Sequence, residues 1–158
     1  MGDRANVVIK ETYQEKTNYV FLYTHWRGYS LPHLVQAALQ RRCRWSDGAY
    51  LTRIIFDGMT DGEQGGELGF GIWPSICDNE HKLIVVDPEE LRIGFTGNPT
   101  WEARASATGV PREMIGYLRW RRSEADTYKD PSPEDVKSWW TFEEYCTLTE
   151  EEIRKAYE

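Results

Sequence analysis

The sequence predicts an α+β domain in which an antiparallel sheet of about five strands carries helices on one face. Three observations indicate this class. Runs rich in valine, isoleucine and aromatic residues, which are typical of strands, occur before and after a central region. The central region places apolar residues at helical spacing, and the C-terminal part repeats helix-start signals. Because 158 residues leave room for one hydrophobic core, we expect a single domain over residues 1–158.

The first two strands are expected at residues 5–11 and 19–25. Both runs are rich in Val, Ile, Tyr and Phe, and the polar residues 14–18 between them favour a turn. The sequence therefore predicts an N-terminal β-hairpin. The segment that follows, His25-Trp26-Arg27-Gly28-Tyr29, is expected to form a corner, since Gly28 allows a sharp bend.

Two helices are expected next, and together they should cover one face of the sheet. Ser30 can cap the first helix, and Pro32 falls in its early turn, where proline is tolerated. The second helix follows Ser46 and ends near Gly58 or Gly62. Each helix has one apolar stripe, formed in the first by Leu31, Leu34, Val35, Ala38 and Leu39 and in the second by Leu51, Ile54, Ile55 and Met59.

Three more strands are expected as a meander at residues 68–73, 82–87 and 91–95. The middle run is almost continuously apolar, which is typical of the most buried strand of a sheet. Pro88 begins a tight turn before the third run. Residues 97–109 show no clean period, and residues 112–122 suit a helix or a strand equally well.

The C-terminal segment, residues 127–158, is predicted to be helical and acidic. Ser132, Thr141 and Thr149 each begin an N-terminal capping pattern. Residues 123–158 contain 11 acidic and 4 basic side chains, so this stretch carries the whole net charge of −7. We expect two or three short helices that pack against an edge of the sheet or wrap around it.

Charge and hydropathy exclude several classes of protein. A nucleic-acid-binding protein needs clustered positive charge, which an acidic chain with balanced remaining charge lacks. No run of 18 apolar residues is present to cross a membrane, and the N-terminus lacks the apolar core of a secretory signal. Three widely spaced cysteines indicate free thiols in a reducing compartment. We therefore expect a cytoplasmic protein.

Two stretches resemble those of small phage, plasmid and actinobacterial proteins. The chain starts Met1-Gly2-Asp3-Arg4-Ala5-Asn6 and continues to Tyr23-Thr24-His25-Trp26-Arg27-Gly28-Tyr29. These stretches are similar to the Gly-x-Arg-x-Asn start and the Tyr-x-His-Trp-x-Gly-Tyr corner of that family, and residues 140–145 are similar to its closing helix. The family has no assigned activity, so the resemblance implies an origin and no mechanism. Many members have a small or acidic residue where Arg27 stands, so no shared role follows for Arg27.

The corner is the candidate ligand site. His25 and Arg27 can hold a phosphate or carboxylate while Trp26 or Tyr29 stacks on a ring. The hairpin is expected to bring Arg4 close to His25, so that the two share an anionic, nucleotide-like ligand. The alternative is that the aromatic residues plug the core and that Asp3 and Arg4 pair internally.

A candidate partner-binding surface lies on the acidic segment. It comprises Trp139, Trp140, Glu143 and Glu144, and it would dock onto a basic protein surface. The alternative is a solvated polar face that keeps the protein soluble. We expect no metal and no cofactor. Cys77 and His81 have half of a zinc spacing without a second pair, and the glycine-rich residues 65–71 lack the Lys-Ser/Thr ending of a phosphate loop.

Two functional hypotheses follow. The first is a non-enzymatic binding protein, derived from a phage or mobile element, that docks onto a host protein or sequesters a small anionic ligand. It is favoured because the sequence predicts no catalytic constellation and is rich in Trp and Tyr. The alternative is a small hydrolase or transferase that uses His25 with a nearby Arg or Tyr. The oligomeric state is not predicted.

Overall fold

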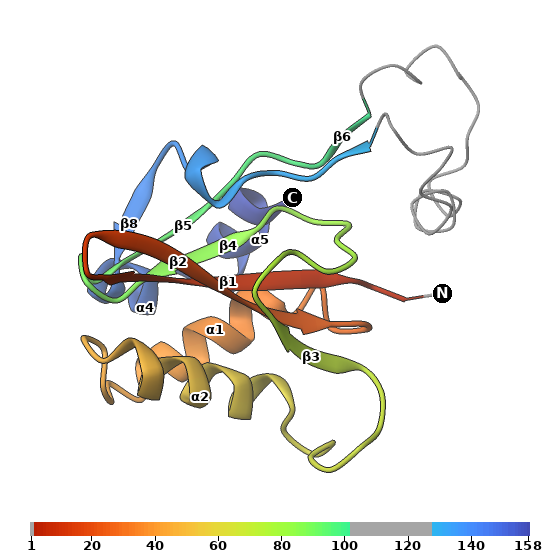
Figure 1. Ribbon diagram of the computed structural model, residues 1–158, viewed down its shortest axis with the longest axis horizontal. Coiled ribbons are helices and arrows are strands. Elements are labelled where there is room, and N and C mark those ends of the chain that lie inside the picture. Colours follow the sequence, from red (N-terminus) through yellow and green to blue (C-terminus); the bar gives the residue numbers. More distant parts are fainter. Residues whose placement is uncertain (1, 102–127) are drawn as a thin grey trace.

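A computed structural model describes residues 2–101 and 128–158 (Figure 1). Six strands form one mixed, mostly antiparallel sheet in the order β3-β2-β1-β4-β5-β8. The α-helices of the described residues pack on one face of this sheet. The α+β class is thus confirmed, and the predicted number of strands was one too low for the main sheet. No helix in the described part of the chain is long and apolar enough to cross a membrane.

The N-terminal hairpin is formed by β1 (Ala5–Tyr13) and β2 (Lys16–Thr24). Their antiparallel register runs from Ala5 opposite Thr24 to Tyr13 opposite Lys16. The turn is a two-residue connection in which Gln14 and Glu15 both have positive φ, at 49° and 63°. Such a turn matches the right-handed twist of the strands, so the ladder extends further than the polar residues 14–18 indicated.

The predicted meander is wrong. β3 (Phe70–Trp73) pairs with β2, whereas β4 (Ile84–Asp87) pairs in parallel with β1 on the other side of the hairpin. All four residues of β4 are buried, so the strand needs neighbours on both sides, which β1 and β5 (Arg92–Phe95) provide. β3 contains a glycine and two exposed side chains, and it lies at the edge.

The central helices are α1 (Leu31–Gln40) and α2 (Gly48–Met59). Ser30 precedes α1 without capping it, because its hydroxyl donates to the carbonyl of Arg27 instead. Asp47, one residue later than predicted, caps α2 by accepting from the amide of Tyr50. The predicted stripes face the core, and all their members are buried except Leu34, which is half-buried.

The C-terminal segment is less helical than predicted. β7 (Tyr128–Lys129), which pairs with β6 (Thr100–Trp101), comes first, followed by a 3₁₀ turn (Pro133–Asp135) and the edge strand β8 (Trp139–Thr141). Helices α4 (Phe142–Thr147) and α5 (Glu150–Tyr157) then pack beside α1, with Thr141 and Thr149 as the predicted caps. The ambiguous residues 112–122, and residues 102–109, lie outside the described residues.

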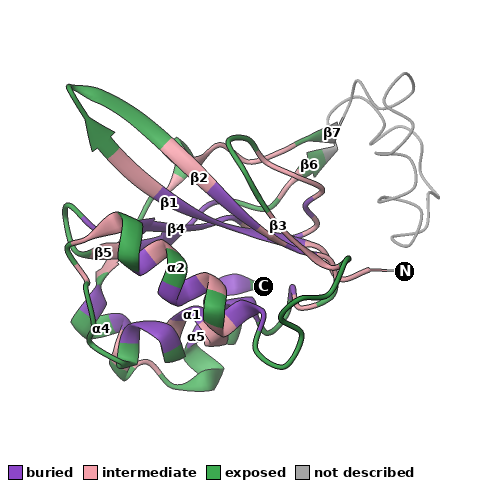
Figure 2. Cartoon of the chain, turned by 60° about the horizontal axis from the view of Figure 1, so that its bottom comes forward, coloured by how far each residue is buried: buried purple, intermediate pink, exposed green. Residues whose placement is uncertain are grey.

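Side chains of alternate strand residues form two apolar clusters, one on each face of the sheet. On the helix-covered face, Val7 and Ile9 contribute to the main core with the buried residues of all four α-helices described (Figure 2). On the opposite face, Val8 joins Phe21, Leu83 and Val85 in a smaller cluster. This smaller cluster is covered by side chains from loops and from the edge strand, namely Ile76, Val136 and Trp139. Both faces of the central strands are therefore shielded from water.

Candidate functional site

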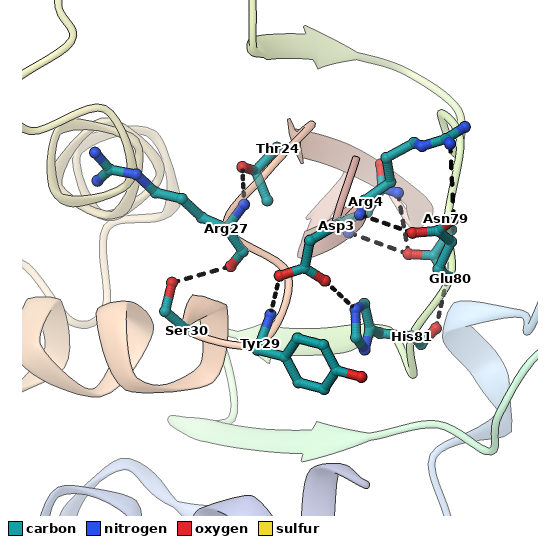
Figure 3. A network of polar contacts seen from close by, with 10 residues as sticks. Asp3, Arg4, Thr24, Arg27, Tyr29, Ser30, Asn79, Glu80 and His81 are labelled. Carbon is teal, nitrogen blue, oxygen red and sulfur yellow. Dashed lines mark hydrogen bonds and ion pairs between the residues drawn. The ribbon is translucent and has the colours of Figure 1, made fainter. Parts of the chain in front are cut away.

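Three segments that are distant in sequence meet at one end of the sheet: the start of β1, the corner at residues 25–29 and the loop at residues 77–81 (Figure 3). The amide of Asp3 donates to the carbonyl of His25 at 2.8 Å, and the amide of Gly28 donates to the carbonyl of Asp3 at 2.9 Å. The amide of Glu80 donates to the carbonyl of Arg4 at 2.9 Å. The first two bonds follow from the hairpin register, which places the two strand ends side by side, and the third attaches the loop to the start of β1.

Arg4 pairs with the loop rather than with His25. Its guanidinium is bound to Asp78 at 2.5 Å and lies 3.7 Å from Glu80, with 12% of the side chain exposed. Burial lowers the pKa of Arg4, but the hydrogen bond to Asp78 and the charge of that carboxylate outweigh it and leave the pKa raised. Arg4 is therefore a permanently charged partner of two carboxylates.

Asn6 fixes the same loop from inside the protein. Its buried amide accepts from the amide of Cys77 and donates to the carbonyls of Cys77 and Asp78. The backbone amide and the side chain of Asn6 both donate to Oδ1 of Asn79, at 3.1 and 3.2 Å. The interaction joins two fully buried amides and saturates them with protein partners, which is what a buried polar group needs.

Asp3 and His81 form a close pair on the side of the hairpin that faces the helices. Oδ1 of Asp3 lies 2.6 Å from Nε2 of His81, and its Oδ2 accepts from the amide of Tyr29 at 2.8 Å. The imidazole stacks on the ring of Tyr157 and meets the edge of Tyr29. A Cβ on Gly28 would lie 2.6 Å from Nε2 of His81, so only glycine fits against this pair.

The Asp3–His81 pair has the form of an oriented general base but lacks a substrate-activating partner. Within residues 2–101 and 128–158, His81 has no hydrogen bond to a hydroxyl or a thiol. Asp3 also holds the corner through its amide, its carbonyl and its second carboxylate oxygen. These contacts are typical of a structural clamp, and they give the enzymatic alternative no further support.

His25 is hydrogen-bonded to a tyrosine of the same strand end. Its Nδ1 lies 2.8 Å from the hydroxyl of Tyr23, and its backbone amide donates to the carbonyl of Gly69. Burial, followed by the negative charge of Asp78, raises the pKa of Tyr23 to about 12. Tyr23 is thus a neutral phenol at physiological pH, and it presents His25 with no ionised group.

Arg27 caps the end of α2. Its guanidinium donates to the carbonyls of Met59 and Asp61 at 3.0 and 3.1 Å and forms an ion pair with Glu63 at 2.7 Å. The side chains of Arg4 and Arg27 point away from each other (Figure 3). The structure therefore gathers the predicted ligand residues at one end of the sheet, but it does not converge their cations on one anion.

The predicted partner-binding residues divide into packed and exposed members. Trp139 and Trp140 are half-buried on opposite faces of β8, with Arg92 over the ring of Trp139 at 4.2 Å and Phe95 against Trp140. Glu143 and Glu144 are exposed on α4, and Glu143 pairs with Arg42. The two tryptophans thus serve mainly to hold an edge strand in place.

A group of exposed apolar side chains, not predicted from the sequence, lies at the opposite edge of the sheet. We call residues 68–73, with the ring of Trp26 beside them, the β3 edge. Leu68, Ile72 and Trp73 are 78%, 55% and 60% exposed, and Trp26 is 42% exposed. The indole of Trp26 packs against Phe70 with ring centroids 5.9 Å apart. Ile72 and Trp73 follow each other along the strand and therefore project from opposite faces of the sheet, so the exposed apolar side chains lie along both sides of this edge. The sequence did predict a strand here, but alternation cannot say whether a strand lies at an edge.

Other chemical sites are scarce in the described residues. No group of three or more His, Cys, Asp or Glu side chains among them is arranged to hold a metal ion. A cleft of about 560 Å³ lies between the β6–β7 ribbon and the 3₁₀ turn, and it is lined by side chains of both charges, among them Lys129, Lys137, Glu134 and Asp135. None of the predicted site residues lines it.

No family model, curated protein or solved structure matches the chain.

Proposed function

We propose that this is a non-enzymatic binding protein that docks onto another protein through the β3 edge. The observation that carries the proposal is the exposure of three large apolar side chains within residues 68–73, at an edge of the sheet, with the exposed Trp26 packed against Phe70 of the same strand. Large apolar side chains scattered singly on a surface need no explanation, whereas a contiguous group marks an interaction site. Tryptophan is also the residue type that contributes most to binding at interfaces.

Docking onto a protein is favoured over sequestration of a small anion. Arg4 and Arg27, the cations proposed for the anion, are each paired with carboxylates, and Arg27 also binds the carbonyls of Met59 and Asp61 at the end of α2. An incoming phosphate would have to displace these partners and leave them unpaired, which costs binding free energy. The resemblance to phage and plasmid proteins supports a mobile-element origin, in which the docking partner is a host protein.

The proposal is tested by selecting binders from a random dodecapeptide display library on the immobilised full chain. Affinities of the enriched peptides are then measured for the wild type, Trp73→Ser and Tyr13→Ser. Tyr13 is a matched control because it is an aromatic residue of a strand end, 69% exposed and far along the hairpin from β3. We expect Trp73→Ser to weaken binding about thirtyfold, the loss typical of a hot-spot residue, and Tyr13→Ser to leave it unchanged. Equal affinity of Trp73→Ser and the wild type would contradict the proposal.

A further inference from the structure

We infer that docking at the β3 edge takes place by strand addition, and that the partner is an extended apolar segment of another protein flanked by lysine or arginine. The inference rests on the proposed function and adds to it a binding mode and a partner chemistry. In this mode the incoming segment becomes a seventh strand of the sheet, next to β3.

The first support is the direction of the backbone groups of β3. The amide of His25 donates to the carbonyl of Gly69, and the register then continues with Gly71 opposite Tyr23. In an antiparallel ladder, residues bonded to the neighbour alternate with residues whose groups point away from it. The N–H and C=O groups of Phe70 and Ile72 therefore point away from β2, and no strand in the described residues pairs with that side. Two donors and two acceptors are available to an incoming strand.

The second support is the lack of the features that usually protect a sheet edge. Residues 68–73, Leu-Gly-Phe-Gly-Ile-Trp, include no charged residue and no proline. Natural edge strands are usually blunted by lysine, proline or a bulge. β3 has none of these within the strand, and only its short length and Pro74, which directly follows it, limit this edge. The opposite edge strand, β8, is three residues long and is preceded closely by Lys137.

Side-chain positions on β3 indicate what the added strand must carry. Phe70 and Ile72 face the helix-covered side, whereas Gly71 and Trp73 face the other side. A Cβ on Gly71 would have no atom closer than 4.0 Å, so there is open room beside Trp73. A large apolar side chain of the partner can fill this room, as aromatic residues do next to glycine in designed sheets. Because successive side chains of a strand point to opposite faces, the partner needs apolar residues at consecutive positions to match both faces.

Charge decides between a foreign segment and a second copy of this chain. Residues 54–81, which include β3, contain six acidic side chains and no lysine or arginine. Four of these carboxylates form ion pairs with Arg4, Arg27 or Arg53, whereas Asp61 and Glu67 form no ion pair within the described residues. Pairing of β3 with β3 of a second copy would bring Asp61 and Glu67 of both copies to one interface. Like charges across an interface are unfavourable, whereas basic residues flanking the incoming strand are complementary to Asp61 and Glu67. The occupant of the edge is therefore a segment with basic flanks.

The test uses the peptides selected from the dodecapeptide library. We expect the enriched sequences to contain a run of consecutive apolar residues with Lys or Arg on at least one side. Ile72→Pro removes an outward-pointing amide while leaving the bonds to β2, and proline is tolerated at such edge positions. It should weaken peptide binding about tenfold more than Ile72→Ala, which removes most of the side chain but keeps the amide. Glu67→Lys should weaken binding of the same peptides, and the affinity of this variant should depend less on salt concentration than that of the wild type.

Amide hydrogen exchange of the unmodified protein provides a readout that does not depend on how the variants fold. Without peptide, the amides of Phe70 and Ile72 should exchange quickly while those of Gly71 and Trp73 are protected. With peptide, Phe70 and Ile72 should become protected. If binding depends on Trp73 but these two amides stay unprotected, docking stands and strand addition is wrong. A different result would be protection of these two amides without peptide that increases with protein concentration as dimers form. In that case the occupant is a second copy and the inferred partner is wrong. Enriched peptides with acidic flanks would also overturn it.

Discussion

At the scale of single residues, the polar groups of the N-terminal motif serve the fold. Asn6, Arg4 and Asp3 alternate along the start of β1, so Arg4 and Asn6 contact the loop on one face while Asp3 contacts His81 on the other. The sequence identified the corner and the N-terminal strand as special. It could not identify their partners, because residues 77–81 are separated from the corner by about fifty positions and from Asp3, Arg4 and Asn6 by 71 to 78, and have the composition of an ordinary turn.

The buried Asn6 amide should be the most sensitive of these residues. Asn6→Ala removes a buried side chain and its four hydrogen bonds to Cys77, Asp78 and Asn79. We expect the free energy of unfolding to fall by about 2–3 kcal/mol, measured by urea denaturation. Asn18→Ala, an exposed asparagine of the same hairpin, is the control and should change it by less than about 0.5 kcal/mol. Equal effects of the two variants would show that the loop is held by other contacts.

At the scale of elements, local sequence signals located the helices well and the strand order poorly. The stripes of α1 and α2 and the caps Thr141 and Thr149 depend on neighbours within four residues, which a sequence displays directly. Which strand pairs with which depends on contacts across the whole domain. The exposure of the β3 edge was missed for the same reason, since Ile72 and Trp73 are as apolar as a core strand.

Arg27 connects the corner to the end of α2, and its removal should weaken that helix end. Arg27→Ala leaves the carbonyls of Met59 and Asp61 without their donor. Thermal unfolding should show that the free energy of unfolding falls by about 1–2 kcal/mol. Arg27→Lys should be more stable than Arg27→Ala but less stable than the wild type, because one ammonium group cannot replace the two donor nitrogens of the guanidinium.

Arg53→Ala is the matched control for this helix. Arg53 is an exposed arginine of α2 that pairs with Asp57, and its loss should cost no more than about 0.5 kcal/mol. If Arg27→Ala left stability unchanged but abolished binding of a nucleotide, Arg27 would be a ligand residue and the capping role would be wrong.

At the scale of the whole molecule, three buried or half-buried tyrosines should make the fold sensitive to alkali. Burial is the first cause of the raised pKa of Tyr23, Tyr145 and Tyr157, with Tyr23 at about 12. A pKa raised above the unfolded value stabilises the fold fully below about pH 10, and this stabilisation is lost as pH rises from about 10 through 12. The free energy of unfolding should fall by about 1–4 kcal/mol between pH 9 and 11.

Tyr157→Phe separates this effect from the rest of the titration. The hydroxyl of Tyr157 is buried and has no hydrogen-bond partner in the described part of the chain, so its removal should leave stability at pH 7 unchanged or slightly higher. Between pH 9 and 11, the free energy of unfolding of this variant should fall less than that of the wild type. A clear loss of stability at pH 7 would mean that the hydroxyl has a partner in the folded protein. Tyr145→Phe is the contrasting variant, because that hydroxyl donates to the carbonyl of Pro32 at 2.8 Å and its loss should destabilise the fold.

The described part of the molecule has two unlike sheet edges: β8, whose tryptophans are half-buried, and β3, where Ile72 and Trp73 are exposed and no described strand pairs with the outer side. Two-dimensional ¹H–¹⁵N spectra of the full chain, titrated with the tightest-binding selected peptide, can locate docking directly. We expect the largest shifts at the amides of residues 68–73 and at the indole of Trp26. Shifts confined to β8, α4 and α5, with residues 68–73 unchanged, would place the partner on the acidic C-terminal segment and contradict docking at the β3 edge.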